Sequence, residues 1–85
     1  MFEEWRGPGR EVAVIGLGKS GVAASRLLLR HGVSVYASDG GAGSALADQA
    51  AALDAEGVQV EVGRHDLARI GRAVAAVVSP GVPPE

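Results

Sequence analysis

The sequence predicts a small α/β domain in which helices pack on a parallel sheet of about four strands. Short β-branched segments alternate along the chain with segments of helical character, in the order β-α-β-α-β-α-β. The composition is 47% hydrophobic but 4% aromatic, with 13 glycines, which suits closely packed strand–helix units better than an all-β sandwich. A length of 85 residues allows one domain, so residues 1–85 are expected to form a single unit.

The first strand–helix unit follows an irregular lead-in. The run EVAVI at residues 11–15 is β-branched and ends at glycines, which predicts a strand. Residues 19–31 contain no proline and are rich in Ala, Leu and Arg, which predicts a helix that Gly32 would end. The expected apolar face of this helix comprises Val22, Leu27, Leu28 and His31.

The second unit repeats this pattern. The run VSVYA at residues 33–37 alternates and predicts a strand, and residues 38–43 are expected to form a loop. Ser44 is expected to N-cap a helix that runs to about Glu56. The apolar stripe of this helix is expected to comprise Leu46, Ala50 and Leu53.

The last part of the chain predicts two strands separated by a short helix. The run VQVEV at residues 58–62 alternates strictly, which indicates a strand with one face partly exposed, as at a sheet edge. Asp66 is expected to cap a short helix through Ile70. The run VAAVV at residues 74–78 is continuously apolar, which predicts a strand covered on both faces.

The alternation of elements also predicts the topology. Parallel strands joined by helices require right-handed crossovers. Two crossovers from the first strand and a fourth strand on its other side lead to the order 3-2-1-4. This is one half of a doubly wound, Rossmann-like fold with three αβα layers, in which ligands bind where the winding reverses.

A glycine motif follows the first predicted strand. Residues 16–21, GLGKSG, fit the pattern G-x-G-x-x-G. Gly16 would permit the tight turn, Gly18 would let a phosphate approach the backbone, and Gly21 would let the helix pack close to the strand. The alternative is that these glycines serve a plain strand–helix turn.

Two further residues of this motif could contact an anion. Lys19 and Ser20 begin the predicted helix, whose free N–H groups and partial positive charge favour an anion. Lys19 fits a solvated surface lysine equally well. The run Gly18-Lys19-Ser20 also resembles the end of a P-loop, but the first glycine of that loop would stand at Ala13, so a P-loop is not expected.

Two other segments are expected at the same edge of the sheet. Asp39 ends the second strand, where an acidic residue can accept hydrogen bonds from a ribose or base, and Gly40 offers backbone contacts. Asp39 could instead cap its own turn. Ser79, Pro80 and Gly81 follow the fourth strand at the switch point, either facing the ligand crevice or forming a strand-ending turn.

Composition and charge exclude several classes of protein. A net charge of −2 provides no electrostatic basis for binding nucleic acid or an anionic membrane. The chain has no cysteine, so it forms neither a disulfide nor a cysteine zinc site. No secretory signal and no apolar run of ~20 residues is present, and a cytoplasmic location is expected. The predicted fold arranges no residue set for catalysis or metal binding.

Three segments, in order along the chain, carry a resemblance to a known family. They are residues 12–21 (VAVIGLGKSG), residues 37–39 (ASD) and residues 77–84 (VVSPGVPP). Together they resemble the N-terminal domain of the MurD-type enzymes of the Mur ligase family. These enzymes are UDP-N-acetylmuramoyl-L-alanine:D-glutamate ligases of peptidoglycan synthesis. The resemblance implies that this chain binds the UDP part of that substrate.

The resemblance also implies a position for each contact. Gly18, Lys19 and Ser20 would lie at the diphosphate, Asp39 at the uracil end, and Ser79 and Gly81 near the sugar-phosphate. The family often has polar residues such as Thr-Arg after the acidic residue, where this chain has Gly40 and Gly41. The complete set expected at the UDP moiety is Gly16, Gly18, Lys19, Ser20, Gly21, Asp39, Gly40, Ser79, Pro80 and Gly81.

The resemblance further implies that this chain is one part of a longer enzyme. The parent would use ATP and Mg, held by further ligase domains, and this part alone would bind substrate without catalysing the reaction. The fourth strand would then leave an apolar edge that the parent covers, through which the isolated chain could self-associate.

Two other functional classes remain open. One is the NAD(P)-binding half of an oxidoreductase, which the glycine motif and Asp39 fit equally well. The run SPGVPP at residues 79–84, which a dinucleotide fingerprint does not require, argues against it. The other is a regulatory or structural βαβ module that binds no ligand.

Overall fold

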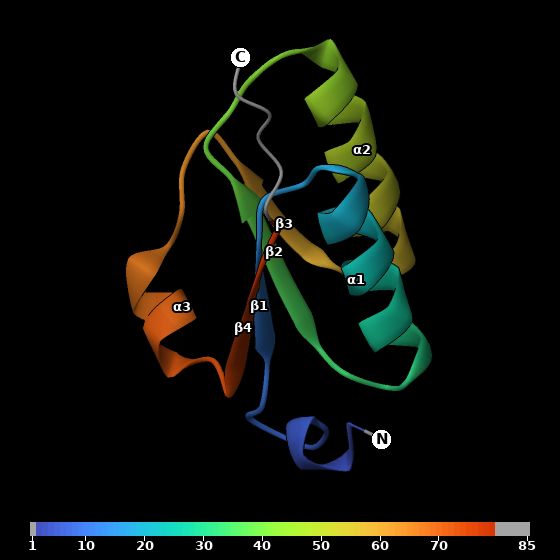
Figure 1. Ribbon diagram of the computed structural model, residues 1–85, viewed down its shortest axis with the longest axis vertical. Coiled ribbons are helices and arrows are strands. Elements are labelled where there is room, and N and C mark those ends of the chain that lie inside the picture. Colours follow the sequence, from blue (N-terminus) through green and yellow to red (C-terminus); the bar gives the residue numbers. More distant parts are fainter. Residues whose placement is uncertain (1, 80–85) are drawn as a thin grey trace.

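The computed structural model describes residues 2–79, which are built around a parallel β-sheet (Figure 1). The four strands are β1 (Val12–Ile15), β2 (Val35–Asp39), β3 (Gln59–Val62) and β4 (Ala75–Val78). They pair in parallel in the order β3-β2-β1-β4. The predicted α/β class and the strand order 3-2-1-4 are confirmed.

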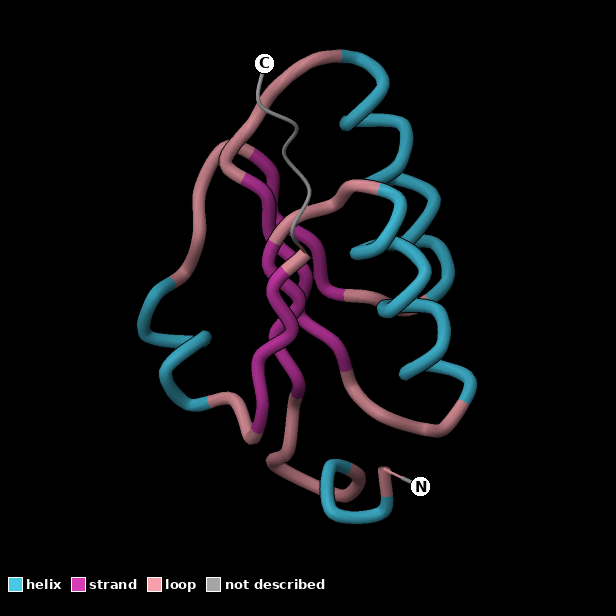
Figure 2. The backbone as a smooth tube through the Cα atoms, in the orientation of Figure 1, coloured by secondary structure: helices cyan, strands magenta, loops and turns pink. Residues whose placement is uncertain are grey.

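Helices cover both faces of the sheet (Figures 1 and 2). Helices α1 (Lys19–Arg30) and α2 (Ser44–Glu56) lie side by side on one face, and α3 (Leu67–Arg72) lies on the other. A short 3₁₀ helix, η1 (Glu3–Trp5), lies near the amino ends of the strands. The result is the expected αβα arrangement. Every helix within residues 2–79 is too short or too polar to cross a lipid bilayer.

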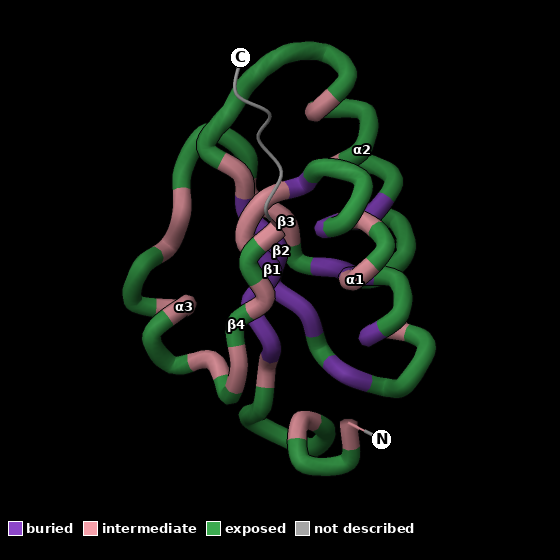
Figure 3. The backbone as a smooth tube through the Cα atoms, in the orientation of Figure 1, coloured by how far each residue is buried: buried purple, intermediate pink, exposed green. Residues whose placement is uncertain are grey.

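Most buried apolar side chains lie between the sheet and the layer formed by α1 and α2. The inner strands β1 and β2 are buried along most of their length (Figure 3). The stripe expected for α2 is confirmed, because Leu53 is fully buried and Leu46 and Ala50 pack against the core. The buried apolar cluster consists of Val12, Val14, Leu17, Leu28, Val33, Val35, Ala37, Leu53 and Val58.

The two edge strands differ in how well the sequence predicted them. The four residues of β3 are intermediate or exposed, as its alternating sequence predicted. The expectation that β4 is covered on both faces is wrong, because Ala76 and Val78 are exposed. In the described part of the chain β4 lies at an edge, and α3 leaves the Val78 side chain 66% exposed.

The face that α1 turns to the sheet matches the expected one only in part. Leu27 and His31, expected on the apolar face, are exposed. The expected Leu28 is buried and the expected Val22 packs against the core, and the helix also buries Gly21 and Ser25. The hydroxyl of Ser25 donates to the carbonyl oxygen of Gly21 at 2.8 Å, so this small polar side chain is satisfied within the helix. Small residues on this face let the helix approach the strands closely.

Several element boundaries shift by one or two residues, and the shifts at β2 and α2 bear most on the loops. The sequence predicts a strand over residues 33–37, but β2 spans Val35–Asp39, so Asp39 belongs to the strand rather than to the loop. The sequence predicts Ser44 as the N-cap of α2, but the N-cap residue is Gly43 and no side chain caps this end. The glycine adopts a φ of 118°, a conformation that serine rarely takes, which explains why the chain turns there.

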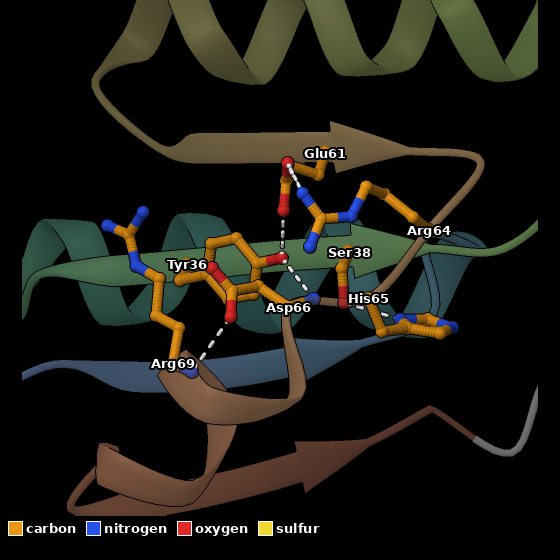
Figure 4. A network of polar contacts seen from close by, with 7 residues as sticks. All are labelled: Tyr36, Ser38, Glu61, Arg64, His65, Asp66 and Arg69. Carbon is orange, nitrogen blue, oxygen red and sulfur yellow. Dashed lines mark hydrogen bonds and ion pairs between the residues drawn. The ribbon is translucent and has the colours of Figure 1, made fainter.

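Polar contacts attach α3 to its face of the sheet (Figure 4). The hydroxyl of Tyr36 donates to Glu61 Oε1 at 2.5 Å and accepts from the backbone N–H of Asp66 at 3.0 Å. Asp66 caps α3, as predicted, by accepting from the N–H of Arg69 at 3.0 Å. The Arg69 guanidinium lies 4.6 Å from the centre of the Tyr36 ring and forms two hydrogen bonds to Glu11, at 2.8 and 2.7 Å. Tyr36 therefore anchors both β3 and the start of α3.

Replacing Tyr36 with Phe removes the acceptor of the Asp66 N–H. We expect the free energy of unfolding to fall by about 1–2 kcal/mol, measured by urea denaturation and circular dichroism. Burial, followed by the hydrogen bond to Glu61, raises the pKa of Tyr36. Since the folded state disfavours the ionised phenol, the wild type should lose stability as the pH rises above about 10, and the Phe variant should not.

Glu56→Gln is the matched control for this prediction. Glu56 pairs with Arg26 at 2.9 Å on the surface, where both side chains are more than a third exposed. Removing an exposed ion pair should change the free energy of unfolding little. A Tyr36→Phe variant that is as stable as the wild type, and loses stability at the same high pH, would contradict the anchoring role.

Candidate functional site

Residues 16–18, called the glycine turn below, connect β1 to α1 at the carboxyl edge of the sheet. Gly16 adopts a φ of 100°, which favours glycine, and its N–H donates to the carbonyl oxygen of Ser38 at 2.7 Å. Gly18 is the N-cap residue of α1, with extended backbone and no side-chain cap. The N–H groups of the first helical turn, which include those of Lys19 and Ser20, therefore begin at an exposed point of the surface.

The packing role predicted for Gly21 is confirmed. A Cβ on Gly21 would lie 1.9 Å from the carbonyl oxygen of Gly16, so any side chain there would push α1 away from the turn. Gly18 differs, because a Cβ there would meet nothing closer than Ser79 Oγ at 3.9 Å. The space beside Gly18 is thus open to a molecule that approaches the backbone, whereas the space beside Gly21 is filled.

Asp39 joins the glycine turn to the turn that follows β2. Its Oδ2 accepts from the N–H of Leu17 at 2.8 Å, and its Oδ1 accepts from the N–H of Gly41 at 2.8 Å. The second bond is the turn-capping alternative weighed from the sequence. The first links residues 22 positions apart, and sequence reasoning did not anticipate it. The ligand contact expected of Asp39 stays a prediction, for which each carboxylate oxygen keeps a second lone pair.

Ser79 lies against the glycine turn, as the switch-point topology predicted. Its N–H donates to the carbonyl oxygen of Ile15 at 2.8 Å, and its Cβ lies 3.1 Å from where a Cβ on Gly16 would stand. Its hydroxyl is buried and has no hydrogen-bond partner within residues 2–79. An unsatisfied hydroxyl beside the start of α1 can donate to an oxygen of a ligand. The predicted contacts Pro80 and Gly81 lie outside the described residues.

The electrostatics of this edge favour an anion. The N-terminus of α1 carries the positive end of the helix dipole, and its first turn contains no acidic residue. Lys19 adds a charge that is exposed at the same point. Gly40 is exposed beside Asp39 at the end of β2. Within residues 2–79 no group of three or more His, Cys, Asp or Glu residues could hold a metal ion.

A separate hollow of about 460 Å³ lies at the other end of the sheet. It is lined by Glu11, Arg69 and residues 32–35, among others. Its two charged side chains pair with each other at 2.7 Å. Because the positive charge of Arg69 is already paired with Glu11, this hollow is less suited to bind an anion than the glycine turn.

The fold and the glycine turn together define a Rossmann-like α/β domain whose carboxyl edge suits an anionic ligand. Residues 10–85 match the family described as Mur ligase MurD-like, N-terminal domain. The chain therefore belongs to the MurD-like N-terminal domain family of the Mur ligases.

Curated relatives in this family carry the name UDP-N-acetylmuramoylalanine–D-glutamate ligase. The protein of Acidobacterium capsulatum is 47% identical over 75 residues, 88% of this chain and 16% of that protein. The protein of Pelobacter propionicus is 42% identical over 74 residues, 87% of this chain and 17% of that protein. The chain thus spans about a sixth of the length of these relatives. No solved structure was found to match it.

Replacing Gly21 with Ala tests the close packing of α1 on the turn. Because the added methyl would overlap the Gly16 carbonyl oxygen, we expect a loss of about 3 kcal/mol in the free energy of unfolding, measured in urea. Gly71→Ala is the control, since a Cβ at this helical glycine meets nothing within 4 Å and should leave stability equal or slightly higher. Equal stability of both variants would show that the turn and helix are not in close contact.

Proposed function

We propose that the chain is the UDP-binding N-terminal domain of an ATP-dependent ligase that adds D-glutamate to UDP-N-acetylmuramoyl-L-alanine in peptidoglycan synthesis. The observation that carries the proposal is the family match over residues 10–85, which includes the glycine turn, Asp39 and the segment from Ser79. The name shared by the relatives supplies the substrate and the reaction. A cytoplasmic location is part of the same proposal.

The geometry supports a specific placement of the nucleotide. The diphosphate would lie at the start of α1, against the backbone of Gly18 and the exposed Lys19 and Ser20. Gly16 and Gly21 would shape the turn beneath it, and the Ser79 hydroxyl, which has no hydrogen-bond partner within residues 2–79, lies beside Gly18. The base end would extend over the carboxyl end of β2, toward Asp39 and Gly40.

The chemistry of amide formation belongs to other parts of the parent protein. ATP and Mg would supply activation of the substrate carboxylate there. Neither fits the described residues, because Ala13 stands where a P-loop glycine would be and no metal-binding cluster occurs within residues 2–79. The role proposed for this chain is to hold the nucleotide so that the other end of the substrate reaches the remaining ligase domains.

Titration with UDP-N-acetylmuramoyl-L-alanine or UDP, followed by NMR, tests the proposal. The amides of residues 18–21, Asp39 and Ser79 should shift, with weak affinity because the chain supplies part of the contacts. Gly18→Ala should weaken binding at least about tenfold by blocking approach to the backbone. Since its φ is −70° and its Cβ would have room, this variant should stay folded, with a loss of about 0.5–1 kcal/mol because alanine is a poorer N-cap than glycine.

Gly71→Ala is the control for this titration, because the glycine lies in α3 and its Cβ would meet nothing. Competition with NADH distinguishes the proposed ligase domain from the NAD(P)-binding half of an oxidoreductase. On the proposal, NADH should not displace UDP. Tighter binding of NADH than of UDP would overturn the proposal in favour of that class. A protein that shows no shifts with any nucleotide would instead fit the ligand-free module.

Self-association through β4 is a further prediction for the isolated chain. Among the described residues, the outer edge of β4 pairs with no other strand, and Val78 in this strand is exposed. Sedimentation equilibrium should reveal dimers at high protein concentration, and Val78→Lys should shift the protein to monomer by placing charge on the edge. A wild-type protein that remains monomeric at millimolar concentration would refute this prediction.

A further inference from the structure

The loop between β3 and α3 brings His65 to the end of β2 (Figure 4). His65 Nδ1 lies 2.6 Å from the hydroxyl oxygen of Ser38, a fully buried residue of β2. The other side of the ring faces the turn after β2, because a Cβ on Gly40 would lie 3.4 Å from His65 Nε2. The imidazole therefore occupies space that a side chain at position 40 would otherwise fill.

The backbone on both sides of His65 is fixed. Before it, the N–H of Gly63 donates to the carbonyl oxygen of Asp39 at 2.7 Å, and Arg64 forms a bridge with the same residue. After it, the N–H of Asp66 donates to the Tyr36 hydroxyl at 3.0 Å. Together with the bond to Ser38, these contacts hold the ring in one orientation before any ligand arrives. Such preorganisation lowers the entropic cost of binding.

The turn beneath the ring lacks polar side chains of its own. Residues 40–43 are Gly-Gly-Ala-Gly, so they offer backbone groups alone. Asp39, the polar residue before the turn, already accepts from the N–H groups of Leu17 and Gly41. His65 Nε2 has no hydrogen-bond partner among the described residues that would compete with a ligand.

We propose that His65 contacts the uracil ring of the bound nucleotide, supplying from the β3–α3 loop the polar side chain that the turn after β2 lacks. This inference rests on the proposed function. If Ser38 donates to Nδ1, Nε2 carries the proton and donates to a uracil carbonyl oxygen. If Nδ1 carries the proton, Nε2 accepts from the uracil N–H. Uracil offers both groups, so either tautomer makes the contact.

Imidazole NMR of the 85-residue chain tests the contact without any substitution. The chain has two histidines, and His31 lies at the far end of α1 against Phe2, with ring centres 5.1 Å apart. In long-range ¹H–¹⁵N spectra, UDP should shift the Nε2 resonance of His65 and leave that of His31 unchanged. Inorganic pyrophosphate, which lacks the base, should shift the amides of residues 18–21 and leave both imidazoles unchanged.

Two variants provide the quantitative test. His65→Ala should raise the dissociation constant for UDP about tenfold and leave that for pyrophosphate within about twofold. His31→Ala is the matched control and should change neither constant. If His65→Ala fails to fold, because it leaves the Ser38 hydroxyl without a partner, the imidazole spectra of the wild type decide.

The outcomes separate this inference from the proposed function. UDP binding with shifts at residues 18–21, but with no change at the His65 imidazole and equal affinity in His65→Ala, would overturn the contact and leave the proposed function standing. A wild-type protein that does not bind UDP would overturn both. Equal shifts of the His65 imidazole by UDP and by pyrophosphate would place the anion, rather than the base, at this residue and would also overturn the inference.

Discussion

The carboxylate of Asp39 joins the two turns on which the candidate site depends. One oxygen accepts from Leu17 in the glycine turn, and the other accepts from Gly41 in the turn after β2. Hydrogen bonds from backbone N–H groups to a carboxylate are stronger than those between neutral groups, and the bond from Leu17 is also partly buried, whereas the bond from Gly41 is exposed. The glycine turn therefore does not depend on β1 and α1 alone for its shape.

Two glycines determine which parts of the glycine turn are packed and which have space beside them. Gly21 brings α1 against the Gly16 carbonyl, so the start of the helix is held at the edge of the sheet. Gly18 leaves space next to the Ser79 hydroxyl, which lacks a hydrogen-bond partner in the described part of the chain. The N–H groups of the first turn of α1, the exposed Lys19 and the Ser79 hydroxyl belong to neighbouring segments at this edge, which is the position proposed for the diphosphate.

The sequence was sufficient for the strand order and for the place of the glycine turn, because alternation and motif spacing are local patterns. It was insufficient for features that depend on contacts between distant parts of the chain, such as the burial of an edge strand. The apolar sequence of β4 cannot show that α3 leaves Val78 exposed. The Leu17–Asp39 and Ser38–His65 contacts join residues that are 22 and 27 positions apart in the sequence. They form only once the strands and loops have packed together. The sequence shows Ser38 and Asp39 next to each other near the end of a strand, but it does not show that they bond to His65 and Leu17.

Native-state hydrogen exchange of the Leu17 and Gly41 amides, in the wild type and in Asp39→Ala, tests most directly whether this carboxylate holds the two turns. We expect exchange about tenfold faster or more at both amides in the variant, since each loses its acceptor. The Gly16 amide, which donates to the Ser38 carbonyl, should keep its protection. Unchanged protection at Leu17 and Gly41 in a folded variant would contradict the account.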